Sequence, residues 1–139
     1  MKHLALSIRQ PWAWAILNSN KRHENRTWST RYRGPILIHA AKGLTRDEYK
    51  SFLMFYEHEI NYGPPYPPSC PPMAALERGG IVGRARIVDC VKASDSPWFG
   101  GPYAFVLDDV HPMPFIPYRG ELGLFEVPDT IFATGETVA

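Results

Sequence analysis

The sequence predicts an α+β protein built on a mixed, mainly antiparallel β-barrel with two or more packed helices. Its apolar patterns indicate five or six strands and two helices, which do not alternate strictly as they would in a parallel doubly wound sheet. The chain has 139 residues, 45% of them hydrophobic, which suits one folded core. We therefore expect a single domain over residues 1–128 and a C-terminal tail over residues 129–139.

The first helix is predicted for residues 10–17, directly after a strand over residues 3–8. Pro11 suits the first helical position, where a missing amide hydrogen costs nothing. Trp12, Ala15 and Ile16 then form an apolar stripe at i, i+3 and i+4. Turn-forming residues end the helix.

Extended structure is predicted next, over residues 21–28, with Glu24 and Arg26 on the same face. A further strand is expected over residues 36–40. The second helix has the clearest signal, because Thr45 and Glu48 make a capping box. Its apolar stripe is predicted to be core and comprises Tyr49, Phe52, Leu53, Tyr56 and Ile60.

The second half of the chain is predicted to be mostly β-structure. Six prolines in residues 61–72 first indicate an irregular or polyproline-like excursion. Strands are then expected over residues 81–91, 103–107 and 122–127. Three prolines, at positions 112, 114 and 117, confine the segment before the last strand to a sheet edge at best.

Charge is distributed unevenly along the chain. Residues 1–50 carry ten Lys and Arg against three acidic residues, a balance of +7, whereas residues 51–139 carry five against eleven, a balance of −6. This asymmetry is typical of a protein with one basic face, although an internal dipole without a partner would give the same pattern. No apolar run approaches the ~18 residues of a membrane span, and the first residues do not resemble a signal peptide. We expect a cytoplasmic protein, or a nuclear one in a eukaryote, with no membrane partner.

Several kinds of site lack their sequence signatures. Cys70 and Cys90 occur in unlike contexts and are expected to be free thiols. No Cys or His pair has the spacing of zinc ligands, and no glycine-rich phosphate loop is present, so we expect neither a metal nor a cofactor. The sequence does not support a serine catalytic triad, because no Gly-x-Ser-x-Gly motif and no evident His–Asp pair accompany the candidate serines Ser7, Ser94 and Ser96.

Basic and aromatic residues are interleaved over residues 9–33, a pattern that favours nucleic-acid binding. Guanidinium groups pair with phosphates and aromatic faces stack on bases. For the tryptophans of this segment the sequence favours a buried role, whereas Arg31 and Arg33, beside Gly34, are expected to be exposed. The nucleic-acid-binding set predicted from this segment is Arg9, Gln10, Trp12, Lys21, Arg26, Arg31 and Arg33.

A second candidate is the loop over residues 92–102, which carries Trp98 and Phe99 between a proline and two glycines. An exposed aromatic pair there would stack on bases, at ~1–3 kcal/mol per base. The alternative is a hydrophobic lid folded onto the proline-rich excursion.

Lys21 and Glu24 are the candidate catalytic residues, because a lysine beside a carboxylate in a cleft can act as a base or a clamp. Glu24 has a structural alternative, a pair with Arg26 at the mouth of the barrel. For Lys21, contact with a phosphate or other ligand and plain surface exposure both stay open.

Three blocks of sequence resemble the opening of the ASCH domain, and of its activating signal cointegrator branch in particular. They are LSIRQPWA at residues 6–13, KRHENRTW at 21–28 and YRGPILIHA at 32–40. Weaker likenesses continue to about residue 128. The resemblance implies a PUA-like barrel that binds RNA or reads modified bases. A branch of that family hydrolyses acetylated cytidine with a lysine, a threonine and a glutamate; Lys21 matches the lysine, but Glu24 stands in the threonine's place.

These observations lead to three hypotheses. The first is a module that binds nucleic acid (RNA or single-stranded DNA) or a modified nucleotide in a basic cleft between the Pro11 helix, residues 21–26 and the Trp98 loop. The second is an enzyme in the same cleft, either an amidohydrolase acting on a modified base or a ribonuclease. The third is a protein-interaction module that uses the proline-rich segment.

Overall fold

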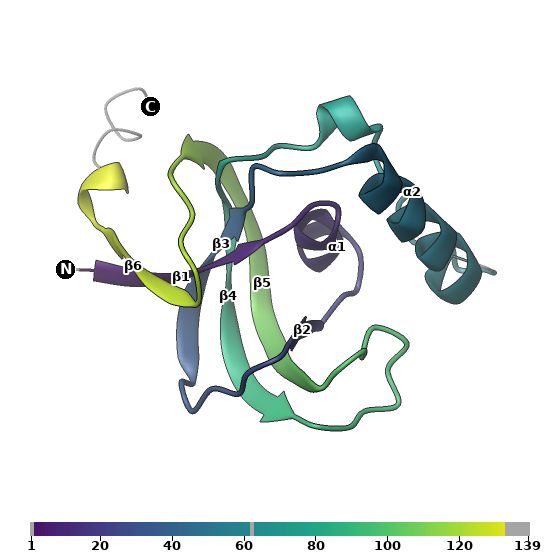
Figure 1. The fold of residues 1–139 in the computed structure, drawn as a ribbon, viewed down its shortest axis with the longest axis horizontal. Coiled ribbons are helices and arrows are strands. Elements are labelled where there is room, and N and C mark those ends of the chain that lie inside the picture. Colours follow the sequence, from purple (N-terminus) through teal and green to yellow (C-terminus); the bar gives the residue numbers. More distant parts are fainter. Residues whose placement is uncertain (1, 62, 133–139) are drawn as a thin grey trace.

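A single six-stranded sheet organises the protein (Figure 1). The computed structural model describes residues 2–61 and 63–132. The strands lie side by side in the order β2-β5-β4-β3-β1-β6, and every pair is antiparallel except β1 with β3. Their bounds are Lys2–Ile8 (β1), His23–Arg26 (β2), Gly34–Ala40 (β3), Gly80–Val91 (β4), Tyr103–Pro117 (β5) and Leu124–Pro128 (β6).

The sheet is open, which corrects the expectation of a closed barrel. Strands β2 and β6 are its two edges, and within the described residues no pairing joins them. Both edge strands are short, with four residues in β2 and five in β6, and each has one backbone partner, β5 and β1 respectively. The mixed α+β class and the mainly antiparallel pairing are confirmed.

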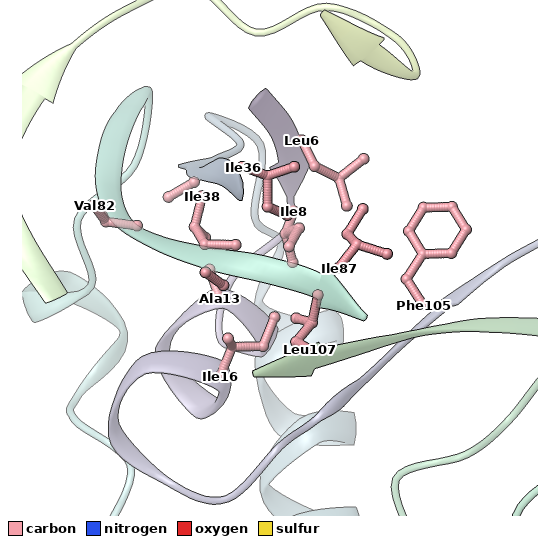
Figure 2. Close-up of a cluster of buried hydrophobic side chains, with 12 residues drawn as sticks. Leu6, Ile8, Ala13, Ile16, Ile36, Ile38, Val82, Ile87, Phe105 and Leu107 are labelled. Atoms are coloured by element: carbon pink, nitrogen blue, oxygen red, sulfur yellow. The ribbon is translucent and has the colours of Figure 1, made fainter. Parts of the chain in front are cut away.

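The main core lies between the sheet and α1 (Trp12–Asn18) (Figure 2). Ala13 and Ile16 of the helix pack against strand residues that alternate along β1, β3, β4 and β5. This arrangement follows from the two-residue period of a strand, which directs every second side chain to one face. The strand members of the cluster are Leu6, Ile8, Ile36, Ile38, Ala40, Val82, Ala85, Ile87, Phe105 and Leu107.

The other face of the sheet carries a smaller apolar cluster. Ala5, Leu37 and Phe125 contribute to it, and Ile131 and Phe132 pack against it. The start of the expected tail therefore contacts the sheet, and residues 133–139 of that tail lie outside the described residues.

Both predicted helices are present. Pro11 flanks α1 and is not its first residue, a difference of one position. The second helix, α2, spans Arg46–Phe55 and continues as a π-helical turn over Tyr56–Ile60. Its capping box is confirmed, since Thr45 accepts a hydrogen bond from the Glu48 amide and Glu48 accepts one from the Thr45 amide. A short 3-10 helix spans Met73–Ala75.

Strand β5 is much longer than predicted, because it continues through the prolines. Pro112 aligns with Gly83 of β4, and Pro117 aligns with Gly80. Proline is tolerated because this half of β5 has a partner on one side only, as β2 pairs only with residues 103–106. The proline-containing half of β5 is thus an edge, as expected, whereas the expected end of the strand at residue 107 is wrong.

The proline-rich excursion is tied back onto α2 and its π-helical turn. The hydroxyl of Tyr49 donates to the Pro71 carbonyl, and that of Tyr56 donates to the Pro68 carbonyl. Both cysteines are free, and burial raises the pKa of the Cys70 thiol to about 11. In the described part of the chain, no helix is long and apolar enough to cross a membrane.

A charged contact joins the end of β1 to the start of α2. Arg9 donates through Nε and Nη2 to the two carboxylate oxygens of Glu48, at 2.9 and 2.6 Å. The hydrogen bonds from Arg9, and then the one from the Thr45 amide, lower the pKa of Glu48 from 4.5 to about 2. Glu48 therefore serves the capping box and the ion pair together.

This contact predicts a specific pH dependence of stability. A carboxyl group whose pKa is depressed on folding stabilises the fold above its unfolded pKa and loses that effect as the pH falls through its folded pKa. The contribution of Glu48 to the free energy of unfolding should accordingly be complete above about pH 4.5 and should be lost as the pH falls from there to about 2. Glu48→Gln keeps the capping geometry but removes the charge. In thermal unfolding, we expect its Tm deficit at neutral pH to vanish toward pH 2; a deficit independent of pH would contradict this account.

Candidate functional site

Two adjoining hollows lie where β1, β2 and the loop between β5 and β6 meet. The larger encloses about 770 Å³ and the smaller about 400 Å³. Ser7, Arg9 and Arg26 line both, so we treat them as one cleft. The larger hollow is also lined by His39, Lys42, Tyr118, Arg119, Gly120 and Glu121, and the smaller by Trp12, Glu24, Asn25, Thr27, Trp28 and Gly101.

The smaller hollow lies where the sequence predicted a cleft. Its walls come from α1 through Trp12, from β2 through Glu24 and Arg26, and from the 92–102 loop through Gly101. These three segments are brought together by the pairing of β2 with β5 and by the packing of α1 on the sheet.

A buried ionic network forms the inner wall of this hollow. Lys21 donates to Glu24 Oε1 at 3.1 Å, and Arg26 donates through Nε and Nη2 to Glu24 Oε2 at 3.2 and 3.0 Å. Arg26 Nη2 also donates to the backbone carbonyl of Ser7 at 2.9 Å, which links β2 to β1. The expected Glu24–Arg26 pair is therefore present, with Lys21 as a second cationic partner.

Lys21 is buried, so the alternative of plain surface exposure is wrong. Only 1% of the Lys21 surface is exposed, and the residue lines neither hollow. The ammonium group also donates to the His23 carbonyl and lies 5.8 Å from the centre of the Trp12 ring. Burial, and then the nearby Lys21 charge, lowers the pKa of His23. Glu24 and Arg26 separate Lys21 from the cleft.

Glu24 reaches the cleft, but both of its carboxylate oxygens already accept hydrogen bonds. Acting as a general base would require the group to release at least one of these partners. The arrangement thus favours a structural role, in which the carboxylate holds two cations in place.

Gln10 does not face the cleft. The side chain is buried, its Oε1 accepts from the Trp14 amide at 2.9 Å, and its Nε2 donates to the Glu77 carbonyl at 2.8 Å. The first bond satisfies one of the open amides at the start of α1. The prediction that Gln10 contacts nucleic acid is corrected accordingly.

Trp98 is also buried, which corrects its predicted exposure. Its indole is packed among Trp12, Phe55 and Tyr56, and its Nε1 donates to Asn20. The loop is a hydrophobic lid, as the alternative proposed, although it covers α2 and the π-helical turn that follows it.

The loop of residues 92–102 is fastened by Asn25 of β2. The amide nitrogen of Asn25 donates to the Trp98 carbonyl, and its oxygen accepts from the amides of Gly100 and Gly101. Phe99 is half-buried beside the His23 ring, with 6.5 Å between the ring centres. It does not line the cleft.

Arg31 and Arg33 are exposed, as expected, on the loop between β2 and β3. They line neither hollow. Arg33 lies 3.7 Å from Asp89 and donates to the carbonyls of Thr30 and Tyr32.

Sequence reasoning missed the residues that shape the larger hollow. His39 is 1% exposed and is hydrogen-bonded to Ser7. Residues 118–123 also line this hollow. One feature of the sequence could have indicated this hollow: His39 lies within the apolar run of residues 36–41, where a buried polar side chain needs a hydrogen-bonding partner. Lys42 and Arg119 complete the lining, and both are exposed.

A family model described as "ASCH domain" matches residues 6–101, more than half of the chain. The matched range begins within β1 and contains α1, β2, β3, α2 and β4, and with them the whole ionic network. It ends before the loop of residues 118–123. A comparison with curated proteins finds no match.

Removing the Glu24 carboxylate from the ionic network is expected to lower the free energy of unfolding strongly. Glu24→Ala leaves Lys21 and Arg26 without their anion, and breaking a buried pair costs roughly 3–5 kcal/mol. We expect urea denaturation to show a loss of this size. Glu121→Ala, which removes an exposed carboxylate of the same cleft, should change the unfolding free energy by less than about 0.5 kcal/mol. Equal losses in both variants would contradict the role given to the network.

Proposed function

The chain belongs to the ASCH domain family, and we propose that it binds nucleic acid, or a nucleotide with a modified base, in the cleft. The observation that carries this proposal is the charge of the lining. Four cationic side chains, from Arg9, Arg26, Lys42 and Arg119, face two carboxylates, from Glu24 and Glu121. Cationic clefts attract the phosphate backbone.

The four cations are not equally available to a phosphate. Arg26 is held by Glu24, and Arg9 is held by Glu48. Within the described ranges, neither Lys42 nor Arg119 forms an ion pair. We therefore assign the phosphate contacts first to Lys42 and Arg119, with Arg9 at the boundary between the two hollows.

The smaller hollow supplies aromatic surface for a base. Trp12 and Trp28 are half-buried there, each packed edge to face against a core phenylalanine. Rings held in this way offer a rigid apolar contact, and base–aromatic contacts contribute about 1–3 kcal/mol each. Both hollows have volumes typical of small-molecule sites, about 300–1,000 Å³.

Binding is favoured over the other two hypotheses. The candidate catalytic pair, Lys21 and Glu24, is engaged in the buried network, which argues against acid–base work by these two residues. The proline-rich segment is bonded to Tyr49 and Tyr56, as expected for a surface excursion packed on its own protein.

The proposal predicts salt-dependent binding of single-stranded RNA that depends on the cleft. Affinity, measured by fluorescence anisotropy, should fall as salt rises from about 50 mM, because each phosphate contact releases counterions. Lys42→Ala combined with Arg119→Ala should weaken binding and reduce the slope of log affinity against log salt by about one to two.

Arg31→Ala combined with Arg33→Ala is the matched control, because it removes two exposed cations outside the cleft. We expect this variant to bind nearly as the unmodified protein does. A larger loss in the control than in the cleft variant would move the interface to the loop between β2 and β3. Binding that does not respond to salt would refute the proposal.

A further inference from the structure

Ser7 and His39 form a hydrogen-bonded pair in the lining of the larger hollow. They are aligned across the parallel pairing of β1 with β3, and Ser7 Oγ lies 2.9 Å from His39 Nδ1. The other ring nitrogen, Nε2, lies 2.7 Å from the Tyr118 carbonyl oxygen. The imidazole is therefore held at both nitrogens.

These contacts determine the tautomer of His39. A carbonyl oxygen only accepts hydrogen bonds, so Nε2 must carry the ring proton and donate it to Tyr118. Nδ1 of the neutral ring is then an acceptor, and the Ser7 hydroxyl donates to it. The ring is 1% exposed and packs edge to face on Phe125, which fixes its orientation. Ser7 thus has a positioned base, and that base has a third group that orients it.

The surroundings of Ser7 suit a reaction in which negative charge develops. Ser7 is half-buried, and the residue lines both hollows. The Arg26 guanidinium, 2.9 Å from the Ser7 carbonyl oxygen, places a positive charge next to this residue. Gly120 closes over the pair: a Cβ atom there would lie 2.7 Å from His39 Cε1 and 3.0 Å from Ser7 Oγ. Only glycine allows the loop to pass so close.

We propose that Ser7 and His39 are the nucleophile and base of an acyl-ester hydrolase whose substrates are esters with an anionic group. Ser7 Oγ attacks the carbonyl carbon while its proton passes to His39 Nδ1. The bond to the alcohol then breaks, and the alcohol leaves with that proton. Water, deprotonated by the same base, attacks the acyl-serine, releases the carboxylic acid and restores Ser7.

The charges assign the roles of the neighbouring residues. Arg26 stays bonded to Glu24 and to the Ser7 carbonyl, so its positive charge acts on the substrate's carbonyl oxygen through its field and not as a direct hydrogen-bond donor. Lys42 and Arg119 hold the anionic part of the substrate, which selects anionic over neutral esters. This activity goes beyond nucleic-acid binding and uses neither Lys21 nor Glu24 as a catalytic group.

A serine-directed fluorophosphonate tests the pair directly. Attack by Ser7 forms an oxygen–phosphorus bond and expels fluoride, which leaves one stable adduct per chain. Intact-mass spectrometry should show a single adduct, and peptide mapping should place it on Ser7. Ser7→Ala should abolish labelling, whereas Ser29→Ala, at an exposed serine outside the cleft, should label as the unmodified protein does. His39→Gln should label at least about 100-fold more slowly, the smallest effect typical of losing a general base.

Several outcomes would overturn the proposal. They are no adduct on folded protein, an adduct mapped to another serine, and unchanged labelling in a His39→Gln variant whose circular dichroism is native. Peptide mapping of the unmodified protein needs no variant, so it decides the question even if a substitution prevents folding. A turnover assay with 4-nitrophenyl acetate should also show a burst of nitrophenol, which is expected of an acyl-enzyme. Labelling is measured without RNA, so its result is independent of the binding experiment.

Discussion

The Glu24 carboxylate holds together the part of the protein on which the cleft depends. Lys21 lies in the segment between α1 and β2, and Arg26 is the last residue of β2. The Arg26 side chain donates to the Ser7 carbonyl on β1. Removing one member of this largely buried group of two cations and one anion leaves a charge without its partner, which is strongly destabilising. A short strand with one backbone partner is thereby joined to the other side of the open sheet by a side chain. The cleft lies along this bridge.

Much of the fold could be predicted because its signals are local. The capping box at Thr45, the stripe of α1 and the alternation within β3 each depend on neighbours in sequence, and each element is present. Closure of the sheet and the length of β5 depend on which strands meet. Prolines indicate an edge, but they do not reveal how far a strand with one free edge continues.

The site was less predictable, because residue type does not determine burial. Gln10, Lys21 and Trp98 resemble ligand-binding residues in sequence, yet each has its polar group satisfied by the protein itself. Ser7 and His39 are 32 positions apart, and only the parallel pairing of β1 with β3 brings them together. No spacing rule in the sequence marks such a contact.

The position of β1 between β3 and the edge strand β6 also has a consequence for how the protein is made. This strand is synthesised first, but one of its edges pairs with β3 and the other with β6, the last strand. During translation its outer edge stays unpaired until residues 124–128 have left the ribosome. Contacts between such distant parts of a chain form slowly, because the intervening loop must close first. Until then the nascent chain exposes the unpaired N–H and C=O groups of a strand edge, which can pair with another chain and lead to aggregation.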